Sequence, residues 1–324
     1  MTVRPTTSVV IRSYTEERWE YLTAALQSVQ EQTSPALEAI VVIDHNPELL
    51  ARVQTSFPDV VAVENQFERG SSGAWNSGVA ATKGEVIAFL DDDALAEPDW
   101  LERLGTGYGD PDVVGVGGAI EPVWLKGKPR WFPEEFYWIV GCTYRGMPEI
   151  ATPVRNLIGC NMSFRRHIFD ELGAFRNDLG HKGKRPIGGD ETELCIRILK
   201  RWPYKVLLHE PKAKVSHMVP SARSGWSYFC WRCYLEGQSK ARLSRLVGKD
   251  VGLSSERAYA FKTLPRGIMR GVADVMRRSD PAGIGRAGAI VAGLTITIMG
   301  YLVGTVSLHL EGRKQAAELD VDRI

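Results

Sequence analysis

The sequence predicts a three-layer α/β/α protein with a mostly parallel sheet, followed by a C-terminal helical extension. In the first two hundred residues, short apolar, strand-like runs alternate with segments whose apolar residues recur at helical spacing. This alternation is typical of a parallel sheet that is covered by helices on both faces. Beyond Ser221 the remaining patterns are helical, so the extension is expected to add no strand.

Each element is predicted from a local pattern. Apolar runs predict strands over Ser8–Ile11, Ala39–Ile43, Val60–Val63 and Val86–Leu90. Residues at helical spacing predict a first helix through Leu22, Ala25, Leu26 and Val29, ended by Ser34-Pro35, and a second through Leu49, Leu50 and Val53. A Gly/Ser loop, Gly70–Gly73, opens a third helix over Ala74–Ala81. The carboxyl ends of parallel strands meet at one edge, where ligands of such sheets bind.

The fourth strand ends abruptly in three acids, Asp91, Asp92 and Asp93. Adjacent carboxylates repel one another and are costly to desolvate, so a cation is expected beside them, and removing one charge should slightly stabilise the metal-free protein. Because alternate residues of an extended chain share a face, Asp91 and Asp93 should converge while Asp92 points away. This arrangement suits a hard divalent cation that holds a diphosphate. The alternative is a solvated loop rich in Asp.

Composition excludes some classes of function. The chain has 324 residues with 40 basic and 39 acidic side chains, a net charge of +1 that gives no electrostatic argument for nucleic acid. Its five cysteines are scattered and odd in number, which favours a reducing cytosolic compartment over a disulfide framework. The first apolar run is too short for a secretory signal, so none is expected.

Two later segments are unusual in composition. Aromatic residues crowd the segment from Trp124 to Trp138, which predicts either a structural cluster or a platform for a sugar or lipid-linked acceptor. From Ala287 to Leu308 no residue carries a charge, and this length matches the roughly 20 residues that cross a bilayer. A buried core helix and a helix lying in the membrane interface remain alternatives for that stretch.

In this order, the segments resemble those of family 2 glycosyltransferases, nucleotide-sugar-dependent enzymes of the type A fold. The resemblance covers roughly residues 6 to 220 and rests on the ordered set rather than on any one motif. The matching segments are Ser8–Ile11, Ile40–Asp44, Gly70–Gly78, Gly84–Asp93, Gly159–Ser163, Gly189–Cys195 and His217.

The resemblance implies a donor site and a metal site. Asp44 is expected at the base or ribose, Asp91 near the ribose and the metal, and Asp93 as the principal metal ligand. The late histidine, His217, is expected to approach the metal or diphosphate; the alternative is a core histidine satisfied by backbone groups. The implied donor-binding set is Ser13, Tyr14, Asp44, Asn76, Asp91, Asp92 and Asn161. The implied ligands of Mn²⁺ or Mg²⁺ are Asp93, Asp91 and His217.

The general base is expected at the start of the helix after Gly188-Gly189. The family has a Glu-Asp pair there, whose Asp deprotonates the acceptor hydroxyl. This chain has the reverse order, Asp190-Glu191. Position by position, Glu191 lies where the family's base falls, but either carboxylate can serve. The alternative is that both acids only stabilise the positive end of the helix dipole.

Three departures from the family pattern bear on function. Arg12-Ser13-Tyr14 replaces Pro-Thr-Tyr after the first strand, so recognition of the base can differ. Trp75 replaces an arginine that is frequent in the Gly/Ser loop and removes one candidate contact to phosphate or base. A Gln-x-x-Arg-Trp motif is missing at Ile198–Trp202, which argues against a processive polysaccharide synthase.

The predicted function is inverting, metal-dependent transfer of one sugar from a UDP-, GDP- or dTDP-sugar to a glycan or lipid-linked acceptor in cell-envelope synthesis. Two alternatives belong to other classes: a membrane-anchored, non-catalytic nucleotide-sugar-binding scaffold, and a nicotinamide-dependent dehydrogenase. The dehydrogenase is disfavoured because Arg12–Thr15 stands where Gly-x-Gly-x-x-Gly would follow the first strand.

The expected organisation is a catalytic domain over 1–235, an amphipathic helical region over 236–286, a membrane-spanning or membrane-embedded helix over 287–308 and a tail over 309–324. Basic residues gather before the apolar stretch, so the positive-inside rule places that side, and the catalytic domain, on the cytoplasmic face of the cell membrane. Membrane lipid is an expected partner. Gly300 and Gly304 form a Gly-x-x-x-Gly motif that predicts oligomers through the C-terminal helices.

Overall fold

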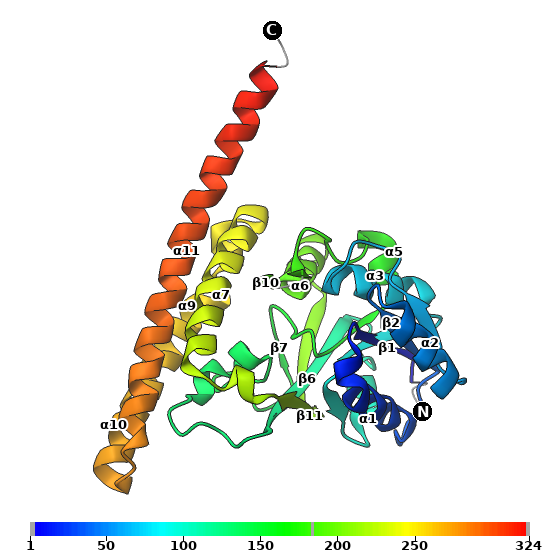
Figure 1. Ribbon diagram of the computed structural model, residues 1–324, viewed down its shortest axis with the longest axis horizontal. Coiled ribbons are helices and arrows are strands. Elements are labelled where there is room, and N and C mark those ends of the chain that lie inside the picture. Colours follow the sequence, from blue (N-terminus) through cyan, green and yellow to red (C-terminus); the bar gives the residue numbers. More distant parts are fainter. Residues whose placement is uncertain (1–3, 183–184, 322–324) are drawn as a thin grey trace. The chain divides into compact units, whose positions relative to one another are not determined.

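The computed structural model describes residues 4–182 and 185–321 (Figure 1). Two compact units are distinguished within it. The first comprises residues up to 125, 140–186 and 190–219, and the second comprises 126–139, 187–189 and the chain from 220 onward. The predicted border at residue 235 falls inside a helix, because composition changes there while the helical backbone continues.

The N-terminal part of the first unit follows the predicted alternation of strands and helices. Its strands are parallel and nearly continuous in Val and Ile, because both faces of the sheet are covered. The strands are β1 (Thr7–Ser13), β2 (Glu38–Ile43), β3 (Val61–Glu64) and β4 (Val86–Asp91). The helices are η1 (Glu16–Arg18), α1 (Trp19–Gln30), α2 (Pro47–Ser56) and α3 (Ser71–Ala81).

The remaining strands complete a nine-stranded sheet of order β3-β2-β1-β4-β8-β6-β11-β5, with β7 paired to β11. Most strands are parallel, as predicted; β8, β5 and β7 run antiparallel to their neighbours. These strands are β5 (Ala94–Ala96), β6 (Val113–Trp124), β7 (Thr152–Pro153), β8 (Asn161–Arg165) and β11 (Val206–Val219). A separate two-stranded sheet joins β9 (Gly180–Lys182) to β10 (Arg185–Ile187).

The core of the first unit is built around Phe89 of β4. Its ring makes edge-to-face contacts with Trp75 of α3 at 4.9 Å and with Phe175 at 5.5 Å between centroids, each worth about 0.5–1.5 kcal/mol beyond its burial. Gly78 lets α3 approach β1 closely, since a Cβ there would overlap Val10. This contact fixes the position of the α3 N-terminus at the sheet edge. The other helices of this unit are α4 (Trp100–Gly107), α5 (His167–Leu172) and α6 (Asp190–Arg201).

Most of the aromatic segment expected between Trp124 and Trp138 lies in the second unit, where its rings form a structural cluster. Phe132 and Phe136 are buried and lie 5.5 and 5.3 Å from Phe229 between ring centroids. Trp226 stacks on the same phenylalanine with an interplanar angle of 10°. Rings that are used to pack one another are not a free platform, so the structural alternative holds for these residues. Phe132 lies just before η2 (Glu134–Val140), which contains Phe136, whereas Trp226 and Phe229 belong to α7 (Trp226–Val247).

The second unit is otherwise helical, as the sequence predicts. α10 (Leu264–Arg278) and α11 (Ala282–Val321) form an antiparallel hairpin, with Gly271 against Gly283. In the part of the chain that the structure describes, Ala282–Glu311 is long and apolar enough to cross a membrane. Shorter elements precede the hairpin: α8 (Lys249–Gly252), α9 (Ser254–Ala258) and the π-helix η4 (Tyr259–Thr263).

The Gly-x-x-x-Gly motif of α11 packs against α7 of the same chain (Figure 1). A Cβ on Gly300 would overlap the carbonyl of Tyr234, and one on Gly304 would lie 3.0 Å from the Cβ of Ala241. The glycines therefore allow close contact between two helices within one molecule. The expectation that they mediate oligomers has no support, because this face of α11 is already covered.

Candidate active site

β1 and β4 end side by side at the carboxyl edge of the sheet, and their ends carry the first ion pair of the site. The register sets Arg12 opposite Asp91, with Nη2 of Arg12 3.1 Å from Oδ1 of Asp91. The guanidinium also lies 4.5 Å from the ring centroid of Trp75. Burial lowers the pKa of Arg12, but the charges of Asp91 and Asp190 outweigh it and raise the pKa overall. Arg12 therefore stays charged beside both acids.

The other two acids of the run are held by Arg18, on the turn that follows β1. Its Nη1 lies 2.7 Å from Oδ1 of Asp92 and 3.1 Å from Oδ2 of Asp93. Ser13 donates a hydrogen bond of 2.6 Å to the other oxygen of Asp92. Burial raises the pKa of Asp92 despite the opposing charge of Arg18. Asp92 is thus directed away from Asp91 into protein contacts.

His217, on β11, is bound by side chains rather than by backbone groups. Its Nε2 lies 3.2 Å from Oδ1 of Asp93, and its Nδ1 lies 3.7 Å from Sγ of Cys142. Burial lowers the pKa of His217, but its hydrogen bonds to Asp93 and Cys142 outweigh that effect and raise the pKa to about 10. Contacts on both ring nitrogens fix the plane of the imidazole at the acidic edge.

The donor atoms gathered here fit a hard divalent cation. Asp91, Cys160 and His217 each offer a ligand atom, and these atoms lie within 4.8 Å of one another. Asp93 adjoins the same histidine. Burial and the charges of Asp91 and Asp93 raise the pKa of the Cys160 thiol well above its usual value, so it stays protonated and is a poor ligand. The oxygens of Asp91 and Asp93, with Nε2 of His217 once its proton has been displaced, are donors that Mn²⁺ or Mg²⁺ accepts.

Asp44 follows β2 and organises the Gly/Ser loop. Its Oδ2 accepts a hydrogen bond of 3.0 Å from the backbone N–H of Gly70, and its Oδ1 accepts one of 2.7 Å from Asn65. Gly70 has φ +133°, a conformation that glycine tolerates best. The carboxylate thus fixes the backbone that leads into α3.

The pair of acids at the start of α6 divides into two environments. Asp190 is 5% exposed, and its Oδ2 accepts hydrogen bonds from Ser71 at 3.1 Å and from Ser72 at 3.0 Å. Glu191 is half-buried. Both acids lie in the first turn of α6, where the helix dipole favours negative charge. Asp190 therefore ties the Gly/Ser loop to α6, next to Glu191.

Comparison with known proteins identifies the family to which this chain belongs. The family model "Glycosyl transferase family 2" matches residues 8–173. A glucosyl-dolichyl phosphate glucuronosyltransferase from Haloferax volcanii is 40% identical over 237 residues, 72% of this chain and 75% of that protein. The chain is a family 2 glycosyltransferase. Neither the dehydrogenase nor the non-catalytic scaffold gains support.

Solved structures show that the glycosyltransferase has the type A fold. A mannosyltransferase from Pyrobaculum calidifontis, in complex with GDP-Man and Mn²⁺, aligns with TM-score 0.59 and 22% identity over 95% of this chain and 88% of that chain. The structure of GalNAc-T7 with UDP, GalNAc and Mn²⁺ aligns with TM-score 0.53 and 16% identity over 81% of this chain and 57% of that chain. The predicted fold class is confirmed.

Two asparagines expected to contact the donor form hydrogen bonds within the protein. Asn161 is fully buried; its Oδ1 accepts from Trp100 at 2.8 Å and its Nδ2 donates to the carbonyls of Ala119 and Ala213. These contacts occupy both ends of the Asn161 amide, so the structure gives no support to a contact between Asn161 and the donor. Its amide instead joins α4, β6 and β11 beneath the acidic edge.

Asn76 is used in the same way. This residue of α3 is 7% exposed and exchanges hydrogen bonds of 2.9 Å with both backbone groups of Phe175. Its Nδ2 also lies 3.1 Å from Oδ1 of Asn177. The side chain thus anchors the segment that precedes β9. We assign it to the support of the site rather than to the donor.

The two residues expected to bind the donor just after the first strand lie in different environments. Ser13 is 2% exposed and donates to Asp92, whereas Tyr14 is 57% exposed beside Arg18. Arg18 and Cys142 are not among the site residues that the sequence predicts. Because three adjacent acids require positive charge nearby, a cationic side chain such as Arg18 could have been expected beside them. Nothing in the sequence pairs Cys142 with His217.

Proposed function

We propose that this glycosyltransferase transfers one sugar, with inversion at the anomeric carbon, from a nucleotide sugar to a sugar carried on a polyprenyl phosphate. One observation carries the proposal: the ligand atoms of Asp91, Asp93 and His217 lie at the edge where Arg12 pairs with Asp91, and the charge of Asp190, which begins α6, acts on the same guanidinium. The relative from Haloferax volcanii makes a glucuronosyl donor and a glucosyl-lipid acceptor the first pair to test.

The part of the site that binds the nucleotide sugar stabilises the departing diphosphate. Asp91, Asp93 and His217 would hold a divalent cation, which neutralises the charge that develops on the departing diphosphate. Arg18 keeps Asp92 and Asp93 oriented, and Cys142 holds the ring of His217. These contacts preorganise the site, so that its groups need little rearrangement at the moment of reaction.

The acceptor side supplies the general base. Glu191 takes the proton from the acceptor hydroxyl while the oxygen attacks the anomeric carbon opposite the leaving diphosphate, and this geometry gives inversion. Asp190 is held by two serine hydroxyls and is nearly buried, which favours a positioning role. The half-burial of Glu191 suits a group that must reach the acceptor.

A lipid-linked acceptor requires that the enzyme work at a membrane. We place it at the cytoplasmic face, where nucleotide sugars are expected. The apolar helix α11 offers a means of association, and exposed basic residues of α10 suit anionic lipid.

The experiment is transfer from UDP-glucuronate, UDP-glucose and GDP-mannose to glucosyl polyprenyl phosphate, with Mn²⁺, Mg²⁺ or chelator. Mass spectrometry identifies the lipid product and NMR its anomeric configuration. We expect metal-dependent transfer of a single residue with inversion, best with the uronate donor. Repeated addition of sugars, retention of configuration or full activity in chelator would each contradict the proposal.

A further inference from the structure

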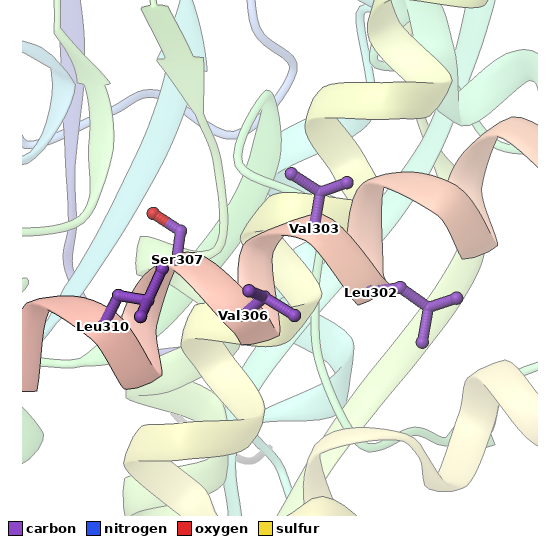
Figure 2. Close-up of a pocket in the computed structure, with 5 residues that line it drawn as sticks. All are labelled: Leu302, Val303, Val306, Ser307 and Leu310. Carbon is purple, nitrogen blue, oxygen red and sulfur yellow. The ribbon is translucent and has the colours of Figure 1, made fainter.

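α11 has two opposite faces. Gly293, Gly300 and Gly304 are seven and four residues apart, so they share the face that packs on α7 and on buried aromatic rings. The opposite face is an apolar stripe, and Figure 2 shows its part at Leu302, Val306 and Leu310. Its side chains are each 50–60% exposed: Val291, Ile298, Met299, Leu302, Val306 and Leu310. Leu302, Val306 and Leu310 also line a shallow hollow of about 440 Å³.

α10 adds a second exposed surface of a different kind. Met269, Val272 and Met276 share one face by their spacing and are 66%, 40% and 81% exposed. Arg266 and Arg277 are also exposed, and because they are eleven residues apart they lie on one neighbouring face. An apolar face bordered by arginines is typical of a helix that lies in the headgroup region of a membrane.

The partner of α11 argues against a membrane-spanning orientation. α7 runs parallel to it, with Tyr234 at Gly300, Ala241 at Gly304, and Nη1 of Arg245 donating 2.6 Å to the carbonyl of Leu308. From Gly293 to Leu308, the predicted spanning segment is therefore accompanied by α7. α7 carries Arg232, Glu236, Lys240, Arg242 and Arg245.

A spanning α11 would carry these charges into the hydrocarbon. Charged side chains at that depth are costly, and α7 has an ionic network: Lys240 lies 3.3 Å from Glu236 and 2.7 Å from Glu256. The apolar stripe faces away from α7. A helix that lies flat buries the stripe and leaves these charges in water.

We propose that α11 lies in the plane of the membrane and does not cross it. Its apolar stripe enters the edge of the hydrocarbon, while Arg266 and Arg277 of α10 contact anionic headgroups. At about 1.5 Å per residue, the stripe from Val291 to Leu310 extends roughly 30 Å along the surface. The inference rests on the membrane association in the proposed function and specifies its geometry.

The first test locates the C-terminus. Full-length enzyme with an epitope tag after Ile324 is bound to sealed vesicles that carry the catalytic domain outside, and protease is added without detergent. We expect the tag to be digested as fast as an exposed loop of the catalytic domain. A tag that is protected until detergent is added would show that α11 crosses the membrane and would overturn the inference.

The second test is flotation with vesicles of phosphatidylcholine, with or without phosphatidylglycerol. The double variant Leu302→Glu/Val306→Glu should lose at least about tenfold of its vesicle partitioning, and Arg266→Gln/Arg277→Gln should lose the preference for anionic vesicles. The matched control is Ile150→Glu, which replaces an apolar side chain that is 76% exposed in the first unit. Circular dichroism and donor hydrolysis check that each variant is folded.

The outcomes separate the two claims. If the wild-type enzyme binds neither kind of vesicle, the membrane association in the proposed function fails, and this inference fails with it. If it binds but the stripe variant binds equally well, only the inference fails. If the stripe variant instead turns a dimer into a monomer in sedimentation without changing flotation, a second copy of the chain covers the stripe and the inference is overturned.

Discussion

The acidic run after β4 is balanced by side chains of the protein itself. Arg18 bridges Asp92 and Asp93, Arg12 pairs with Asp91, and His217 adjoins Asp93. The repulsion that sequence alone predicts is therefore offset within the fold. This changes what a substitution at Asp93 should do to stability, because two cationic groups lose a partner.

We expect Asp93→Asn to abolish transfer and to destabilise the metal-free enzyme by about 1–3 kcal/mol, since hydrogen bonds to charged groups are lost in a buried site. Urea unfolding in chelator measures the second effect. Repulsion among the acids alone predicts the opposite sign, so a more stable variant would show that Arg18 and His217 contribute little.

The two acids that begin α6 should respond differently to amidation. Glu191→Gln should lower kcat by roughly 100-fold or more, as for a general base, while donor affinity is kept. Asp190→Asn should lower kcat by less. Ser72→Ala should have a similar effect, because both changes weaken the hydrogen bond between Ser72 and Asp190. If Asp190→Asn is the more damaging change, Asp190 is the base.

Cys142 should act through His217. Cys142→Ala removes the contact to Nδ1 and should weaken Mn²⁺ binding by roughly 10-fold, the scale on which groups behind a metal ligand act. Calorimetric titration with Mn²⁺ alone measures this. Cys142→Ser, which can still hydrogen-bond the ring, should recover most of the affinity; equal loss in both variants would indicate a packing effect only.

At the scale of elements, α11 depends on glycines at its contact with α7. Gly300→Val places a side chain where the carbonyl of Tyr234 lies and should cost about 2 kcal/mol or more in unfolding free energy. Gly288 is the matched control on the same helix, because a Cβ there meets nothing within 4 Å. Gly288→Ala should stabilise the helix by up to about 1 kcal/mol. Similar effects of both changes would refute the packing argument.

For the whole molecule, stability should depend on the cation. A metal that binds the folded state alone adds about 2.7 kcal/mol when its concentration is 100 times Kd. We therefore expect Mn²⁺ to raise Tm and chelator to reverse the rise. Asp93→Asn should remove most of this shift, whereas Ile150→Glu should keep it. An unchanged wild-type Tm across a range of Mn²⁺ concentrations would count against a metal site at this edge.

The sequence by itself determined the order of elements and the edge of the sheet where the candidate site lies. Periodicity located β1 to β4 with α1 to α3, because burial on one face or on both imposes a repeat that a single chain displays. The rule that ligands gather at the carboxyl ends of parallel strands then brought Asp44 and the run Asp91–Asp93 together.

Only the tertiary structure decided which polar groups contact one another. Arg18 reaches Asp92 across 74 positions, and Cys142 reaches His217 across 75; no local pattern encodes such pairs. The same reason explains Asn161, whose burial beneath the site leaves no group for a ligand. It also explains why the sequence leaves the orientation of α11 open. An uncharged stretch has the same composition whether or not a charged helix such as α7 packs along it. Local repeats report how each segment is buried, whereas partners far apart in sequence are set by the packing of the whole chain.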